Sequence, residues 1–361
     1  MIRILGLESS CDETAASVVE ADDEGRLTIL SNVVASQVET HRLYGGVVPE
    51  IAGRAHSEAI TNITYEALEK AGLLPRDLSA VAVTTHPGLI GALLVAVNFG
   101  KSFAAANGLP LLSVDHMKGH IAASYLSEEA PKPPFLALAV SGGHTTFFLV
   151  EDHTVFHRIG ETRDDAIGEA FDKIGRIIGI PYPAGAGFDA LAKEGFARAL
   201  DAEDHIFEKY RKSAAFKDAA YRLPSPAIAD DSLDFSFSGL KTAAINLLHH
   251  AEQTGEAFDK ALFAARYTYE AVEAVAKKTE LAFLRYPSLP LAVSGGVAAN
   301  SHLRRRLQEV AQKHNRRLFI PPLSLCGDNG AMIAAQGYYE FLKGEAFFAD
   351  SSLNACAADE L

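Results

Sequence analysis

Short apolar runs alternate with longer amphipathic segments along most of this chain. Short runs rich in Val, Ile and Leu are typical of buried strands, and apolar positions that recur every three or four residues are typical of helices. The runs predict strands over residues 2–7, 80–84, 111–114, 135–140, 291–293 and 318–320. The longer segments predict helices over residues 49–71, 90–106, 166–178, 258–284, 298–314 and 329–342. Because strands alternate with helices, the pattern indicates an α/β fold with parallel strands.

A Pro-rich bend divides this pattern. Residues 130–134 read APKPP, and because proline continues neither a helix nor a central strand, such a stretch marks a boundary. We therefore expect two lobes, one over residues 1–130 and one over residues 131–361. A second irregular stretch, residues 220–234, is read as a long loop because helical patterns resume on both sides of it.

Composition narrows the class of protein. Apolar residues make up 48% of the 361 residues and charged residues 22%, a balance that excludes wholesale disorder. The longest apolar run, residues 89–97, is far shorter than the roughly 20 residues that cross a bilayer, and the N-terminus does not read as a signal peptide. Cys11, Cys326 and Cys356 have no C-x-x-C spacing, which suits a reducing compartment. We expect a cytoplasmic protein that does not contact a membrane.

The charge balance argues against a nucleic-acid ligand. The chain has 33 Lys and Arg against 46 Asp and Glu, a formal net charge of −13, whereas phosphate contacts usually require a basic surface. The charge is uneven, however, because residues 304–317 contain one acid, Glu309, and six bases: Arg304, Arg305, Arg306, Lys313, Arg316 and Arg317. This segment either brings positive charge to a ligand cleft or is an ordinary solvated helix face.

Two Gly-rich turns follow predicted strands. Residues 138–146 and 291–300 both contain the sequence LAVSGG. Gly142, Gly143, Gly295 and Gly296 have no Cβ atom, so their backbone N–H groups can approach an anion or a nucleotide closely. The alternative is that each is only a tight strand–helix turn.

His116 and His120 are spaced to share one helix face. Imidazoles at positions i and i+4 can bind one metal ion, although a chain with 13 histidines contains such pairs by chance. A further anionic ligand is available in Asp328, whose alternative role is a helix N-cap. Zinc peptidases of the H-E-x-x-H type need a glutamate as base, and Met117 at that position disfavours this mechanism.

Several acids follow the first strand and the predicted helix 166–178. Asp12 and Glu13 replace the Gly-containing phosphate turn of actin-like and sugar-kinase-like ATPases, and either acid could act as a base or orient an amine. Asp172 lies on an otherwise apolar helix, and Asp189 follows a turn at Gly185. These carboxylates either bind ribose hydroxyls or an ammonium group, or they are structural.

Together these motifs resemble one family. The motifs are ESSCDET (8–14), HRLYGGVVPE (41–50), HMKGH (116–120), VSGGHT (140–145), GETRDDA (160–166), FSFSGLKT (235–242), SGGVAAN (294–300) and DNGAMI (328–333). In this order they are similar to the bacterial TsaD family, which makes N6-threonylcarbamoyladenosine in tRNA. The resemblance implies an actin-like, sugar-kinase-like two-lobed fold with a ligand cleft between the lobes and the last helix packed back on the first lobe.

The resemblance also implies an activity and its residues. The family moves a threonylcarbamoyl group from threonylcarbamoyl-adenylate to N6 of the adenosine 3′ of the anticodon, in tRNAs reading codons that begin with A, and releases AMP. His116, His120 and Asp328 would bind one metal ion per subunit, iron(II) or, as the alternative, zinc. The substrate would contact Val140, Ser141, Gly142, Gly143, His144, Asp172, Gly185, Asp189 and Asn300, with Gly295 and Gly296 beside its nucleoside. We assign Asp12 or Glu13 to orienting or deprotonating the amine.

The resemblance further implies partners. Members work with a shorter paralogous actin-like protein, TsaB-like, and a P-loop ATPase, TsaE-like. One face of the predicted helix 49–71 is either a surface for such a partner or a core face. Because the net charge is acidic, we expect the chain alone to bind tRNA weakly. An actin-like ATPase or scaffold subunit is the alternative function. This sequence departs from the family pattern at His86, residues 184–187 and Gly327.

Overall fold

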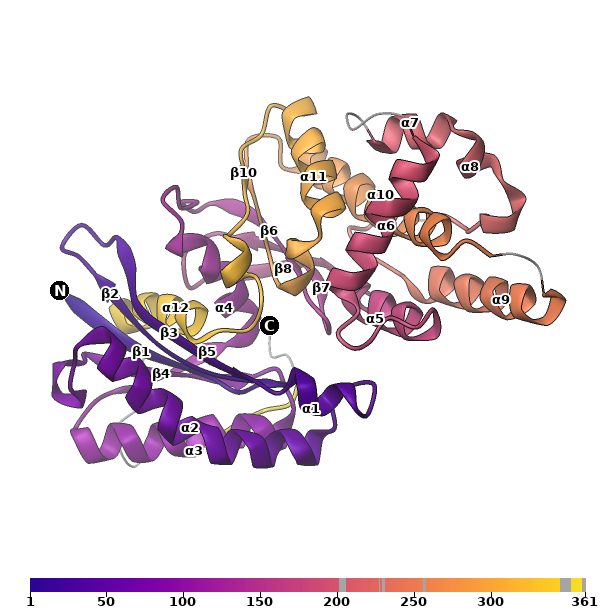
Figure 1. Ribbon diagram of the computed structural model, residues 1–361. Coiled ribbons are helices and arrows are strands. Elements are labelled where there is room, and N and C mark those ends of the chain that lie inside the picture. Colours follow the sequence, from indigo (N-terminus) through magenta and orange to yellow (C-terminus); the bar gives the residue numbers. More distant parts are fainter. Residues whose placement is uncertain (201–205, 227, 229–230, 256–257, 345–351, 359–361) are drawn as a thin grey trace.

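The computed structural model describes residues 1–361 apart from 201–205, 227, 229–230, 256–257, 345–351 and 359–361. The described residues form two five-stranded sheets (Figure 1). The first sheet has the order β3-β2-β1-β4-β5. Its strands are β1 (Ile2–Glu8), β2 (Glu13–Ala21), β3 (Leu27–Ser36), β4 (Ala80–His86) and β5 (Leu111–Asp115). β1, β2 and β3 form an antiparallel meander, and β1, β4 and β5 are parallel.

The second sheet repeats this arrangement. Its order is β10-β9-β6-β7-β8, and its strands are β6 (Phe135–Val140), β7 (Thr145–Val150), β8 (Phe156–Glu161), β9 (Leu291–Ser294) and β10 (Leu318–Phe319). Again the first three strands are antiparallel and the first, fourth and fifth are parallel. The chain therefore contains the same fold unit twice, and the turns after β1 and β6 occupy equivalent positions.

Helices α1 (Val38–Arg42), α2 (Pro49–Ala71) and α3 (Ile90–Asn107) belong to the first half. α2 packs on β2 and β3, and α3 packs on β4. α2 and α3 each end at a left-handed glycine, Gly72 and Gly108. The buried face of α2 contains Ile60, Ile63 and Ala67, so part of the stripe predicted from the sequence lies in the core.

α3 is also apolar enough for a different environment. Among the described helices, it alone has the length and mean hydropathy of a membrane span. Its packing on β4 and α2 buries Leu93, Val97 and Phe103 in the first core. Its apolar residues therefore serve the core on one face.

Two helices cross between the halves. α4 (His116–Ala122) follows the first sheet, yet it packs on β6 and β9 of the second. α12 (Gly330–Lys343) follows the second sheet, yet it packs on β1, β2, β4 and β5 of the first. The two helices also contact one another between the sheets (Figure 1). Their N-terminal ends therefore meet in the middle of the molecule.

The other helices cover the outer face of the second sheet or extend from it. They are α5 (Ile167–Ile177), α6 (Gly185–Ala199), α7 (Ile206–Lys212), α8 (Ala214–Lys217), α9 (Ser238–Thr254), α10 (Lys260–Arg285) and α11 (Ser301–Lys313). Short 3₁₀ turns are η1 (Pro75–Asp77), η2 (Ala123–Leu126), η3 (Ala219–Tyr221), η4 (Gly296–Ala299) and η5 (Leu323–Leu325). The largest apolar core lies here, where α10 packs along α6.

The α/β fold predicted from the sequence is confirmed. The six predicted strands correspond to β1, β4, β5, β6, β9 and β10, and the six predicted helices to α2, α3, α5, α10, α11 and α12. The helix predicted from residue 298 begins at Ser301, after the turn η4. The pattern did not predict β2, β3, β7 and β8. The lobe boundary near residue 130 stays a prediction.

Candidate metal centre and substrate cleft

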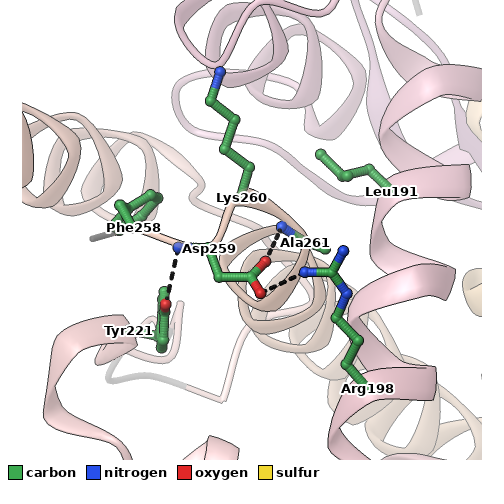
Figure 2. A pocket seen from close by; sticks show the side chains of 7 residues that line it. All are labelled: Leu191, Arg198, Tyr221, Phe258, Asp259, Lys260 and Ala261. Carbon is green, nitrogen blue, oxygen red and sulfur yellow. Dashed lines mark hydrogen bonds and ion pairs between the residues drawn. The ribbon is translucent and has the colours of Figure 1, made fainter.

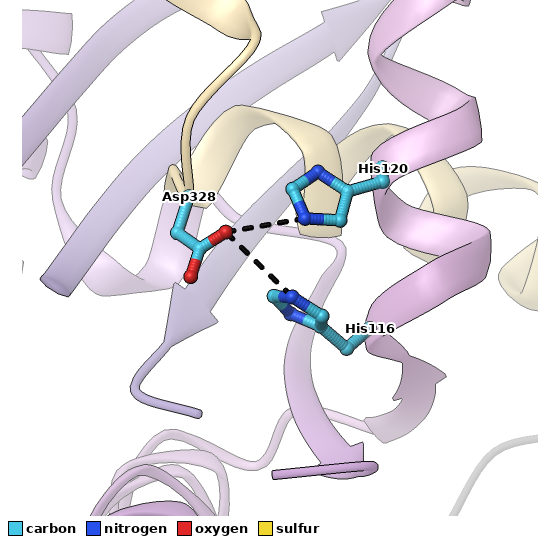
Figure 3. A group of neighbouring side chains, drawn as sticks. All are labelled: His116, His120 and Asp328. Atoms are coloured by element: carbon cyan, nitrogen blue, oxygen red, sulfur yellow. Dashed lines mark ion pairs between the residues drawn. The ribbon is translucent and has the colours of Figure 1, made fainter. Parts of the chain in front are cut away.

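Two histidines and an aspartate converge where α4 and α12 begin (Figure 3). His116 and His120 lie on successive turns of α4, with ring centroids 4.6 Å apart. Oδ1 of Asp328 lies 3.6 Å from Nε2 of His116 and 3.2 Å from Nε2 of His120. One ligand atom from each residue lies within 4.8 Å of the other two. The folding of the chain thus brings together residues from its two halves.

Separate residues cap the two helices, so Asp328 is not needed as a cap. Asp115 accepts a hydrogen bond from the N–H of Lys118 at 2.8 Å and caps α4. Asn329 accepts one from the N–H of Met332 at 2.9 Å and caps α12. The alternative role of Asp328 as a helix N-cap is therefore wrong. Its carboxylate faces the two imidazoles instead.

Glu8 supports His116 from behind. Its Oε2 lies 3.0 Å from Nδ1 of His116 and accepts a hydrogen bond from Oγ1 of Thr84 at 2.6 Å. A carboxylate on Nδ1 fixes the orientation of an imidazole and leaves Nε2 for a metal. Glu8 was missed as a site residue. The available signal was its position as the first acid after a buried strand.

The charges of this group shift its pKa values. Burial disfavours charged His116, but Asp328 and Glu8 outweigh burial and raise its pKa to about 9. Burial likewise opposes ionisation of Asp328, but His116, His120 and His144 lower its pKa. Nε2 of His120 is buried and makes no well-aligned hydrogen bond within the described residues. Two imidazoles and a carboxylate are a donor set for a divalent first-row metal, so these residues fit a metal ion.

The acids after β1 lie next to this group. Asp12 is 7% exposed, and its Oδ2 accepts a hydrogen bond from the hydroxyl of Tyr182 at 3.3 Å. Glu13 accepts one from Oγ of Ser36 at 3.1 Å. Burial, together with the negative charges of Asp328 and Asp12, raises the pKa of Glu13 to about 9. Glu13 is therefore protonated at neutral pH in the metal-free chain.

The two Gly-rich turns lie side by side, because β6 and β9 are adjacent parallel strands. Gly295 has a φ of +94°, and a Cβ atom built on it would lie 2.3 Å from the carbonyl oxygen of Val140. Gly142 and Gly143 are exposed, and no acceptor for their N–H groups is found among the described residues. Only the second turn leads into a helix; the first is a β-hairpin between β6 and β7. The strand–helix reading of the first turn is therefore wrong.

The hairpin turn is held by the start of α5. Ser141 and His144 close the turn, with N–H of Ser141 donating to O of His144 at 2.8 Å. The N–H of Glu169 donates to O of Gly142 at 3.0 Å. A Cβ atom on Gly168 would lie 2.4 Å from the carbonyl oxygen of Ser141. The turn and α5 therefore depend on a glycine for their close approach.

The other predicted substrate residues lie at helix starts. Oδ1 of Asp172 accepts a hydrogen bond from the N–H of Ala184 at 2.7 Å, one residue before Gly185 begins α6, and burial raises the pKa of Asp172. Oδ1 of Asp189 accepts one from the N–H of Ser301 at 3.0 Å. Asn300 caps α11 by accepting one from the N–H of Leu303 at 2.9 Å. Each of these polar side chains has a structural contact in addition to any ligand contact.

The positions that depart from the family pattern make contacts near the site. Nε2 of His86 lies 3.3 Å from Oδ2 of Asp115, the residue that caps the metal helix α4. Ala184 donates its N–H to Asp172. The carbonyl of Gly327 accepts a hydrogen bond from Nδ2 of Asn329 at 2.8 Å. None of these departures removes one of the three candidate ligands.

The basic segment 304–317 does not form an open positive patch. Arg306 pairs with Glu273 and Lys313 with Glu280, both on α10. Arg304 donates to the carbonyl oxygens of Ala298 and Pro321, and Arg317 pairs with Glu129. The cationic-cleft interpretation of this segment is therefore not supported, because neighbouring elements use its cations.

A surface hollow of about 600 Å³ lies at the start of α10, away from the metal group (Figure 2). Its lining residues are Leu191, Arg198, Tyr221, Phe258, Asp259, Lys260 and Ala261. Asp259 caps α10 and pairs with Arg198 across the hollow, while Lys260 points away from this pair (Figure 2). The polar groups of the hollow are thus largely engaged with one another.

Comparison with solved structures identifies the fold. Full-length HypF in its phosphate- and nucleotide-bound form matches with a TM-score of 0.54 and 15% identity, covering 96% of this chain and 47% of that one. HypF of T. kodakarensis matches with a TM-score of 0.54 and 15% identity, covering 95% and 48%. These likenesses concern the fold alone, and the expected actin-like α/β fold is confirmed.

Comparison of sequences identifies the family. A family model described as tRNA N6-adenosine threonylcarbamoyltransferase, TsaD, matches residues 28–335. The enzyme of that name from Moorella thermoacetica is 46% identical over 353 residues, covering 98% of this chain and 95% of the relative. The one from Lactobacillus delbrueckii subsp. bulgaricus is 47% identical over 362 residues, covering 100% and 96%. The chain therefore belongs to the TsaD family of tRNA N6-adenosine threonylcarbamoyltransferases, enzymes that modify tRNA, as its motifs predicted.

Proposed function

We propose that this chain transfers the threonylcarbamoyl group of threonylcarbamoyl-adenylate to N6 of the adenosine 3′ of the anticodon, in tRNAs reading codons that begin with A. N6 attacks the carbamoyl carbon, the bond from that carbon to the adenylate oxygen breaks, AMP leaves, and N6 loses one proton. The observation that carries the proposal is the convergence of His116, His120 and Asp328 beside the buried acids Asp12 and Glu13.

We assign the metal site to one iron(II) ion per subunit, with zinc as the alternative. The mixed nitrogen and oxygen donors suit either ion, and Glu8 holds His116 in the orientation that presents Nε2. A metal bound there supplies a Lewis acid for the oxygens of the acyl donor.

The Gly-rich turns would hold the donor. Backbone N–H groups of Ser141, Gly142 and Gly143 would stabilise negative charge that develops on the carbamoyl oxygen and phosphate. Val140 and His144 flank this turn, and Gly295 and Gly296 would lie beside the nucleoside. Further contacts are assigned to Asp172, Gly185, Asp189 and Asn300.

Asp12 and Glu13 would act on the incoming amine. Asp12 is the stronger candidate for accepting the N6 proton, because Glu13 with a pKa of about 9 holds its own proton at neutral pH. A protonated Glu13 can instead donate a hydrogen bond, and a cation at the neighbouring metal group would lower its pKa. Either acid would orient N6 toward the donor carbon.

We further propose that the chain is cytoplasmic and works with a shorter actin-like paralogue and a P-loop ATPase. The acidic total charge of −13 supports shared binding of tRNA, since one acidic subunit alone makes few phosphate contacts.

Reconstitution tests the proposed reaction. The protein is mixed with threonylcarbamoyl-adenylate and tRNA, with and without the two partner proteins, and the nucleosides are analysed by mass spectrometry. N6-threonylcarbamoyladenosine and equimolar AMP are expected. Steady ATP hydrolysis by the chain alone, with no modified nucleoside under any condition, would instead support an ATPase or scaffold subunit. Cleavage of a glycoprotein without tRNA would support a peptidase.

A further inference from the structure

Three cations surround a short segment at the edge of the cleft. Nε of Arg42 donates to the carbonyl oxygen of Tyr182 at 3.2 Å, and Nζ of Lys260 donates to that of Ile178 at 2.8 Å. Arg176 faces Gly45, where a Cβ atom would lie 3.3 Å from its Cδ. The loop that begins at Arg42, in the first half of the chain, therefore meets residues 176–182 of the second half.

This edge also exposes apolar side chains. Leu43 is 84% exposed, Tyr44 is 58% exposed, and Ile177 is 42% exposed. Each is adjacent in sequence to one of the cations or to another member of the group. We call Arg42, Leu43, Tyr44, Arg176, Ile177 and Lys260 the cleft rim. An exposed aromatic ring flanked by cations is the arrangement on which single-stranded nucleic acids stack their bases.

The rim differs sharply in charge from the cleft behind it. Tyr182 marks the division, because its carbonyl oxygen accepts from Arg42 while its hydroxyl donates to Asp12. The interior behind Tyr182 contains Asp12, Glu13 and Asp172, and these carboxylates would repel phosphate. At the rim, the exposed side chain of Arg176 has no acid partner among the described residues, and Arg42 pairs with the exposed Glu39.

We propose that the cleft rim docks the anticodon loop of the tRNA substrate, with a base next to the target adenosine stacked on Tyr44 and backbone phosphates beside Arg176 and Lys260. This proposal rests on the proposed function, which sends the target adenosine into the cleft. The acidic interior accepts a neutral base and its amine, and the cationic rim takes the phosphates on either side. Charge separation over one residue thus resolves how an acidic protein acts on RNA.

The test measures binding of a fluorescent anticodon stem-loop to the full-length chain over a series of salt concentrations. Tyr44→Ala is expected to raise the Kd about tenfold, because stacking is lost. Arg176→Ala is expected to raise the Kd and to reduce the slope of log K against log salt by about one, as one phosphate contact disappears. Binding of threonylcarbamoyl-adenylate without RNA is expected to stay unchanged in both variants, which shows that the cleft is intact.

The other end of α10 supplies matched controls. Leu284 is 69% exposed and Arg285 is exposed beside it, and the 26 residues of α10 separate them from Lys260 by about 39 Å at 1.5 Å per residue. Leu284→Ala and Arg285→Ala are expected to bind the stem-loop like the unmodified chain. Rim variants that also bind like the unmodified chain would overturn the proposal.

Two further outcomes separate this proposal from the proposed function. If rim variants lose stem-loop binding while the unmodified chain forms no modified nucleoside, the docking surface stands and the reaction fails. If they bind the stem-loop normally but lose affinity for a partner protein, the rim is a protein-docking surface and the proposal is overturned.

Discussion

The two sheets share one strand order, but the groups that follow their strands differ in kind. The first sheet leads into ionisable side chains: Glu8 and Asp12 after β1, and His116 after β5. The second leads into glycines, Gly142 after β6 and Gly295 after β9. A duplicated fold unit has thus given one half side-chain chemistry and the other half backbone N–H groups. The cleft needs both, since a metal requires ionisable ligands and an adenylate requires close backbone approach.

The largest effect is expected from removing the side-chain chemistry of the first half. His116→Ala and His120→Ala each delete a candidate metal ligand, and each should reduce formation of modified nucleoside by more than about 100-fold, beyond the 10–100-fold typical of outer-shell changes. Metal content by elemental analysis and nucleoside yield by mass spectrometry check this, with thermal unfolding to show that the fold survives.

Glu8→Gln and His157→Ala calibrate that result. Glu8→Gln keeps both imidazoles and weakens only their support, so a loss of about 10–100-fold is expected. His157 is exposed and pairs with Glu151, and its replacement should change neither metal content nor yield. Full modification by a metal-free double variant, His116→Ala with His120→Ala, would contradict a role for the metal.

A smaller effect is expected from adding one carbon to the second half. Gly295→Ala combines a backbone conformation that is essentially restricted to glycine, at roughly 1–3 kcal/mol, with a Cβ atom 2.3 Å from O of Val140. The melting temperature should fall by several degrees. Gly296→Ala is the matched control for stability, because no atom lies within 4 Å of a Cβ there. Equal melting temperatures for the two variants would show that the close approach to Val140 is not required.

The smallest effect is expected at the helix that supports the first Gly-rich turn. Gly168→Ala should push Ser141 away and raise the KM for threonylcarbamoyl-adenylate about tenfold, with less change in kcat. Gly91 is also the second residue of its helix, α3, and has open space around it. Gly91→Ala should leave KM unchanged and stabilise the chain by about 0.5–1 kcal/mol. The same KM in both variants would rule out the positioning role of α5.

Sequence reasoning found the central strands more readily than the outer ones. β1, β4, β6 and β9 are short apolar runs, so each carries its signal in its own residues. β3 instead mixes buried and half-buried positions with polar Ser31 and Asn32. Such a strand is defined by pairing with a neighbour, which a local pattern does not contain.

The site shows the same limit. The spacing of His116 and His120 predicted one shared face, because four residues make about one helical turn. Spacing could not exclude the N-cap role of Asp328, since that depended on Asn329 capping α12 instead. Nor could counting charges on α11 reveal Glu273 and Glu280, which come from α10 and neutralise Arg306 and Lys313.

The exchange of α4 and α12 between the sheets has a consequence for how the protein is made. Ile4, Ala82 and Leu112 of the first sheet are covered by Met332, Ile333 and Tyr338 of α12. During synthesis the first sheet emerges long before α12, so one of its apolar faces stays bare until the ribosome has nearly finished. Asp328 arrives in the same late stretch, and therefore the nascent chain cannot complete its metal site before its second half has folded.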